Sequence, residues 1–124
     1  MRTTLKATNI DHTNAIDTYV SKRMRDLEKV LDAKEKSSIA RIDVGLTNKH
    51  HKEGKEQYYA EITFHVKGKD FRVVTKAPDL YEAIDQMRDR IVRDVTKHHD
   101  RTRTERKAGA REVKRRIGAA QKWN

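Results

Sequence analysis

The side chains of this chain that could do chemistry form a row of cations in its second half. Spacings of three and four residues separate Arg90, Arg93, Lys97 and Arg101. On an α-helix these positions fall within roughly 80° of one another, beside an apolar stripe. Guanidinium and ammonium groups bind phosphate oxygens well, so the row indicates a line of phosphate ligands. The alternative is a solvated face with local pairs such as Asp89 with Arg93.

Residue patterns for catalysis or metal binding do not occur in the sequence. It has no cysteine, no phosphate-binding glycine loop and no serine elbow. The doublets His50-His51 and His98-His99 could suggest zinc ligands, but neighbours in sequence point in different directions and no third ligand is spaced to join them. We therefore expect a protein that is not an enzyme and that uses no metal, cofactor or small-molecule substrate.

Charge is distributed unevenly along the 124 residues. The net charge is +10, and residues 101–124 hold nine Lys and Arg against two Glu. This excess predicts a polyanionic partner, most commonly nucleic acid. The length fits one domain, which we assign to residues 1–100. A basic tail at 101–124 follows, which either extends the last helix or stays flexible until a partner orders it.

The apolar residues form no membrane or export signal. No apolar run is long enough to span a bilayer, and the N-terminus reads directly as a strand rather than as a signal peptide. We therefore expect a cytoplasmic protein with no membrane partner. The lack of cysteine agrees with a reducing compartment.

Two amphipathic helices must position the cations, and the first is predicted from the N-cap residue Thr13 to about Leu31. Its apolar positions are Ile16, Val20, Met24, Leu27 and Leu31. The basic residues opposite this stripe are Lys22, Arg25 and Lys29. Arg23 differs because it falls within the apolar sector, so we expect its stem to pack on the core rim and its guanidinium to reach toward a ligand.

The second helix is predicted over residues 77–99. Its apolar positions are Leu80, Ile84, Met87, Ile91 and Val95. Pro78 suits the first turn, and Asp79 with Glu82 suits the positive end of the helix dipole. Lys97 and the histidines after it suit the negative end, so the pattern predicts a helix end near His99.

Alternating apolar and polar residues predict strands at 2–8, 40–47, 58–66 and 71–76. A charged loop is expected at 49–57 and a turn at 67–69. The last three strands would form an antiparallel meander. The order β-α-β-β-β-α therefore predicts an α+β two-layer sandwich, with both helices on one face of a four-stranded sheet.

This order contains the α-β-β-β-α order of a double-stranded-RNA-binding domain, so a fold like that domain is expected. The usual RNA-binding features of such domains are not found here. The second helix opens with the acidic sequence APDLYEAID, and the strand loops read HKEGKEQ and KGK. A general binder of structured or double-stranded RNA, such as an RNA chaperone, remains the alternative function.

The sequence up to about residue 100 resembles the family of ribosome hibernation-promoting factors and ribosome-associated inhibitors. The resemblance lies in Thr13-Asn14-Ala15-Ile16, in the first-helix residues Val20, Arg23, Leu27, Glu28 and Lys29, in Lys76, Asp79, Leu80, Tyr81, Ala83 and Ile84, and in the basic residues Arg90, Arg93 and Lys97. The start D-[LM]-Y-x-A-I, followed by cations in this register, is fairly specific in combination.

The resemblance implies a translation inhibitor that binds the small ribosomal subunit where mRNA and tRNA lie, through the backbone of 16S rRNA. It implies competition with mRNA and tRNA during stasis. The phosphate ligands that it implies are Arg23, Lys29, Lys76, Arg90, Arg93 and Lys97. The helical wheel adds Lys22, Arg25 and Arg101 to this set.

Residues after 100 are too few for the dimerisation domain of long family members, so the resemblance is to a short form, which we expect to be monomeric. The tail cations that we expect to touch rRNA are Arg103, Arg106, Lys107, Arg111, Lys114, Arg115 and Arg116.

Overall fold

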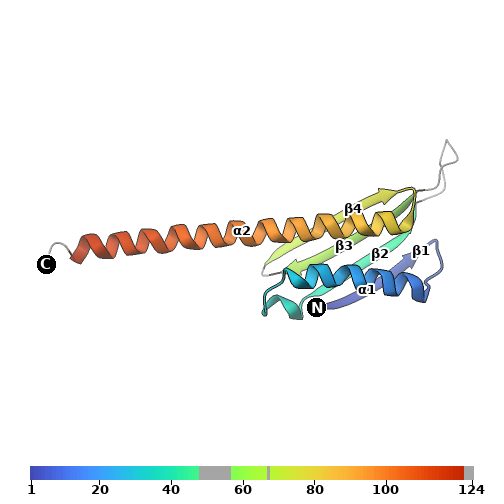
Figure 1. Cartoon of the computed structure of the whole chain (residues 1–124), viewed down its shortest axis with the longest axis horizontal. Coiled ribbons are helices and arrows are strands. Elements are labelled where there is room, and N and C mark those ends of the chain that lie inside the picture. The colour runs from blue at the N-terminus through green and yellow to red at the C-terminus, as the bar shows by residue number, and fades with distance from the viewer. Residues whose placement is uncertain (48–56, 67, 122–124) are drawn as a thin grey trace. The chain divides into compact units, whose positions relative to one another are not determined.

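A computed structural model describes residues 1–47, 57–66 and 68–121, with side chains through residue 115. Within these residues the chain forms β1 (Arg2–Thr8), α1 (Asn14–Lys29), β2 (Ile39–Leu46), β3 (Tyr58–Val66), β4 (Lys69–Ala77) and α2 (Leu80–Gln121). A 3₁₀ turn, η1 (Glu35–Ser37), precedes β2. Figure 1 shows both helices on one side of the sheet. The predicted α+β sandwich is therefore confirmed.

The four strands form one sheet in the order β1-β2-β3-β4. β1 runs parallel to β2, and the other neighbours are antiparallel, as the predicted meander requires. Alternate residues of each strand face the helices. The buried ones are Ala40, Ile42, Val44, Ala60, Ile62, Phe64, Val66, Phe71, Val73, Thr75 and Ala77. The likeness to the double-stranded-RNA-binding domain stays a prediction.

Helix α1 begins where the sequence predicts. The backbone N–H of Ile16 donates to the Thr13 side chain over 3.2 Å, so Thr13 satisfies one of the free donors of the first turn. The helix ends at Lys29, two residues before the predicted end at Leu31. Leu31 is nevertheless buried, so its place in the core was predicted correctly.

Helix α2 begins later than predicted. Asp79 caps it, because the N–H of Glu82 donates to the Asp79 carboxylate over 3.2 Å and the N–H of Ala83 donates to the Asp79 carbonyl over 3.1 Å. Pro78 therefore precedes the helix instead of occupying its first turn. The predicted apolar stripe is confirmed, since Leu80, Ile84, Met87, Ile91 and Val95 are all buried.

Helix α2 also continues past the predicted end near His99 and runs to Gln121. No glycine or proline follows His99 closely, so nothing in the local sequence ends the helix there. Residues 101–121 are thus helical, which is the first of the two expectations for the tail. The chain divides into two compact units, residues 1–94 and 95–124. The division into a domain at 1–100 and a tail at 101–124 stays a prediction.

Several predicted features lie outside the described residues. These are His50-His51 with nearly all of the charged loop at 49–57, Lys67 of the predicted turn and residues 122–124 of the predicted tail. Gly68 of that turn has φ of +77°, a conformation that glycine adopts without strain. Among the described helices, none has the length and hydrophobicity needed to cross a membrane.

Candidate nucleic-acid interface

The cations of α1 are exposed on its outer face. Lys22 and Arg25 are exposed, and no carboxylate of the described residues pairs with either. Lys29 lies 3.5 Å from Asp26, but the lysine side chain is 76% exposed. Exposed pairs of this kind contribute well under about 1 kcal/mol, so Lys29 can exchange Asp26 for a phosphate at little cost.

Arg90 of α2 reaches the edge of the sheet. Arg90 donates from Nη1 to the carbonyl oxygen of Val74 over 3.1 Å, so its guanidinium reaches the edge strand β4. Lys76 follows two residues later on β4 and is exposed, as is Arg93. Arg90 uses one of its five N–H donors on Val74, which leaves others for an anion. The structure therefore brings Arg90 close to the strand that carries Lys76.

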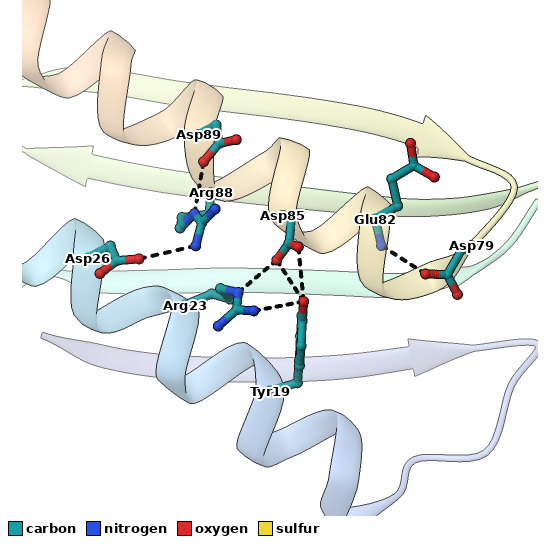
Figure 2. Close-up of polar contacts among 8 residues, drawn as sticks. All are labelled: Tyr19, Arg23, Asp26, Asp79, Glu82, Asp85, Arg88 and Asp89. Carbon is teal, nitrogen blue, oxygen red and sulfur yellow. Dashed lines mark hydrogen bonds and ion pairs between the residues drawn. The ribbon is translucent and has the colours of Figure 1, made fainter.

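Arg23 has a different environment from the one predicted. Figure 2 shows it between the helices, where its Nε donates to Asp85 over 2.7 Å and its Nη2 donates to the Tyr19 hydroxyl over 2.8 Å. Its guanidinium carbon also lies 4.2 Å from the centre of the Tyr19 ring. The Tyr19 hydroxyl donates to the same Asp85 carboxylate over 2.9 Å. One edge of the guanidinium is therefore already bound within the protein.

A second ion pair continues this contact between the helices. Arg88 of α2 donates to Asp26 of α1 over 3.2 Å and to its neighbour Asp89 over 2.9 Å (Figure 2). We call the five residues Tyr19, Arg23, Asp26, Asp85 and Arg88 the interhelical seam. Of these five residues, only Arg23 was predicted from the sequence. A usable signal was present, since Arg23 stands within an apolar sector and needs a carboxylate nearby.

The seam shifts the pKa values of its members. Partial burial alone would raise the pKa of Asp85, but the hydrogen bonds from Arg23 and Tyr19 outweigh it and hold that pKa below its ordinary value of 3.8. Burial raises the pKa of Tyr19, and the hydrogen bond to Asp85 raises it further. The hydrogen bond to Asp85 raises the pKa of Arg23. Asp85 and Arg23 are therefore both charged at neutral pH, with Tyr19 neutral between them.

The lowered pKa of Asp85 predicts a loss of stability in acid. A carboxylate with a folded pKa below its unfolded pKa stabilises the fold fully above the unfolded value, and that contribution disappears as the pH falls through the folded value. Urea unfolding between pH 7 and pH 2 should therefore show a smaller acid-induced loss of stability in Asp85→Asn than in the original chain. Asp89→Asn, which removes a 67% exposed carboxylate from the same helix, is the control. Equal pH profiles for Asp85→Asn and the original chain would contradict the role of the seam.

The seam and the edge of the sheet lie on opposite sides of α2. Arg88 reaches α1, whereas Arg90, two residues later, reaches β4. Two residues on a helix differ by about 200°, which explains the divergence. The predicted cations of the first unit therefore lie in three places. Lys22, Arg25 and Lys29 are on the outer face of α1, Arg23 is in the seam, and Arg90 reaches the edge strand β4 that carries Lys76.

The second unit carries the remaining predicted residues. Lys97 and Arg101 are exposed, and so are the tail cations Arg103, Arg106, Lys107, Arg111, Lys114 and Arg115. Arg115 lies 3.6 Å from Glu112, and the side chain of Arg116 lies outside the described part. The rings of His98 and His99 are tilted, with centres 6.3 Å apart. Among the described residues, no three His, Cys, Asp or Glu side chains are grouped so that they could hold a metal ion.

Fold and charge together are typical of small basic domains that contact nucleic acid. Comparison with known families is more specific. Residues 3–103 match the family described as Sigma 54 modulation protein / S30EA ribosomal protein, and the chain belongs to this family. The predicted resemblance to hibernation factors is thereby confirmed.

Named relatives agree with this assignment. The chain is 28% identical over 101 residues to the ribosome hibernation promoting factor of Escherichia coli K12, a match that covers 82% of this chain and 96% of the relative. The crystal structure of the Thermus thermophilus Protein Y N-terminal domain superposes with a TM-score of 0.64 and 30% identity, covering 79% of this chain and 99% of that one. A ribosomal subunit interface protein from Coxiella burnetii has the same fold, with a TM-score of 0.63, 13% identity and coverage of 81% and 99%.

Proposed function

We propose that this protein is a cytoplasmic ribosome hibernation factor that binds the small ribosomal subunit and blocks translation. In this proposal it contacts the phosphate backbone of 16S rRNA and occupies the channel for mRNA and tRNA. The family and the relatives named for ribosome hibernation support the ribosome as the partner. The position in the channel and the contacts with 16S rRNA are specific to this proposal. Binding, rather than catalysis, is its mechanism.

One observation carries the proposal, which is that most of the predicted cations are exposed and have no carboxylate partner. Among the described residues these cations are Lys22, Arg25, Lys76, Arg90, Arg93, Lys97 and Arg101. Acidic residues of the same helices pair elsewhere, as Asp85 does with Arg23 and Asp26 with Arg88. The positive field at the surface is therefore left uncompensated, which favours a polyanion as the ligand.

The proposed mechanism is steric exclusion. Phosphate contacts fix the position of a protein on RNA without reading base sequence, so the shape of the folded rRNA must supply specificity. A domain held in the channel overlaps mRNA and tRNA and excludes both. Arg23 has a supporting role in this scheme, since it holds α1 against α2 through Asp85 and Tyr19. The α1 cations are thus presented from a helix that is fixed to its neighbour.

Co-sedimentation with purified small subunits across a salt series tests the proposal. We expect Arg90→Gln/Arg93→Gln to weaken binding tenfold or more at 0.1 M salt. Each lost phosphate contact should make the fall of log K with log salt less steep by about 1. Lys6→Gln/Arg41→Gln is the matched control. It removes the same charge from two exposed residues on the sheet face away from the helices and should bind nearly as the original chain does.

Competition separates this function from its alternative. A channel-bound factor is displaced by mRNA together with tRNA and prefers the assembled subunit to naked RNA. A general RNA chaperone binds long RNA and subunits with similar affinity. Equal losses in the Arg90/Arg93 variant and in the Lys6/Arg41 control, without displacement by mRNA and tRNA, would contradict channel occupancy.

A further inference from the structure

The second unit has a helix face that holds five cations and one alanine. At about 100° per residue, five exposed cations of α2 fall within roughly 140° of one another. We call them the basic stripe, which consists of Arg103, Arg106, Lys107, Arg111 and Lys114. None of the five has an ion-pair partner among the described residues. Ala110 is exposed within the same sector, and its short side chain leaves space between the longer cationic side chains of the stripe.

The opposite side of the same helix has both acids of the tail. Glu105 and Glu112 lie about 100° or more outside the edges of the basic stripe. Glu112 pairs with Arg115 over 3.6 Å, and Arg115 lies outside the stripe, about 40° beyond its edge. Among the described residues from 101 to 115, the acids and the basic stripe therefore lie on different sides of the helix. The exposed Asp100, three residues before Arg103, falls in the sector of the stripe at its N-terminal end. Separation of the tail acids from the stripe is not required for solubility, which net charge alone would supply.

The basic stripe destabilises the free helix. Like charges four residues apart, as in Arg103 with Lys107 and Lys107 with Arg111, repel by about 0.2–0.5 kcal/mol per pair. Gly109 lies in the middle of the stretch, and a Cβ added there would meet nothing within 4 Å. Packing among the described residues therefore does not require a glycine at this position. A glycine inside a helix costs about 1 kcal/mol of helix stability relative to alanine. A bound polyanion would remove the repulsion.

We propose that the basic stripe is a second RNA-binding site, which grips a phosphate backbone along one face of the helix. This inference rests on the proposed function, since it takes RNA as the partner. The stripe from Arg103 to Lys114 extends about 17 Å along the helix, enough to follow several successive phosphates. Three of its five residues are arginines, whose planar fork matches phosphate geometry, and Ala110 lets the backbone approach closely.

The test measures binding of the full chain to a 20-base-pair RNA duplex of arbitrary sequence, by fluorescence anisotropy across a salt series. Lys107→Gln/Lys114→Gln breaks the stripe with a residue of similar helix propensity. We expect its affinity to fall tenfold or more at 0.1 M salt, and the fall of log K with log salt to become less steep by about 2. The same variant should lose a similar factor on purified small subunits, because backbone contacts do not depend on sequence.

A charge-restored variant is the matched control. Lys107→Gln/Lys114→Gln/Glu105→Gln/Glu112→Gln has the net charge of the original chain but a broken stripe. We expect it to bind the duplex as weakly as the double variant. Recovery of the original affinity would overturn the proposal, because net charge alone would then explain binding. Circular dichroism confirms that the variants retain their helix.

Two further outcomes would also overturn the proposal. The first is that Lys107→Gln/Lys114→Gln binds the RNA duplex as tightly as the original chain does. The second is that this variant loses binding to phosphatidylserine vesicles but keeps its binding to RNA, which would make an anionic membrane surface the ligand of the stripe. The Arg90→Gln/Arg93→Gln variant separates this proposal from the proposed function, since it should lower subunit binding more than duplex binding. If Lys107→Gln/Lys114→Gln weakens binding and Arg90→Gln/Arg93→Gln does not, the channel proposal is wrong and the proposal for the basic stripe is retained. If Arg90→Gln/Arg93→Gln weakens subunit binding and the stripe variant changes neither ligand, only the proposal for the basic stripe is wrong.

Discussion

Gly45→Ala is expected to destabilise the protein by about 1–3 kcal/mol or more. Gly45 is buried in β2 between Thr8 of β1 and Tyr59 of β3. A Cβ at this position would lie 2.1 Å from the carbonyl oxygen of Thr8 and 3.1 Å from the Tyr59 ring. The nearest obstacle is backbone, which cannot rotate away as a side chain can. The substitution must therefore push β1 away from β2.

Urea unfolding followed by circular dichroism checks this expectation, and Gly109→Ala is the matched control. The control makes the same change in open space on a helix, where it should stabilise that helix by up to about 1 kcal/mol. The two substitutions should therefore shift stability in opposite directions. Shifts of the same sign and size would contradict the close packing of β1 on Gly45.

Leu27→Ala is expected to cost about 2–5 kcal/mol of the free energy of unfolding. Leu27 is fully buried on the inner face of α1. Truncating it removes apolar contacts and leaves a cavity, and the surrounding core relaxes only partly. The total free energy of unfolding of a domain is about 5–15 kcal/mol, so the loss is a large fraction of its stability.

Leu27→Met is the control for this prediction, because it keeps nearly the same volume and should cost under about 1.5 kcal/mol. Both variants are compared by urea unfolding at neutral pH. The exposed Val113→Ala in the second unit should change stability little, since its side chain is already 56% exposed. A cost for Leu27→Ala as small as that for Val113→Ala would contradict the burial of Leu27.

The layers of the fold were predictable because they depend on local patterns. Alternation at 58–66 and helical spacing from Ile16 to Leu27 each mark one buried face, and the structure buries those faces. Thr13 marked the start of α1 through its own hydroxyl. The start of α2 was less clear, since Pro78 and Asp79 both suit a helix start and only the hydrogen bond to Glu82 decides between them.

The partners of the cations were not predictable in the same way. Arg23 finds Asp85 across 62 positions of the sequence, and Arg90 finds a backbone carbonyl on β4. Both contacts depend on how α1, α2 and β4 pack, which no local pattern contains. The position of Arg23 in an apolar sector predicted a guanidinium that reaches toward a ligand, and it did not indicate that Asp85 would bind it. The sequence therefore predicts which residues are cationic and exposed better than it predicts which of them are already paired.

The parallel pairing of β1 has a consequence for the order of folding. Val66 pairs with Lys69 across a tight turn, whereas Arg2 pairs with Ile39 only after α1 and η1 have been made. Contacts between residues far apart in sequence form slowly, because the entropy cost of closing a long loop comes before the favourable free energy of the contacts. We therefore expect the β3–β4 hairpin to form early and β1 to join late. The first strand along the chain is therefore expected to be the last of the four to join the sheet.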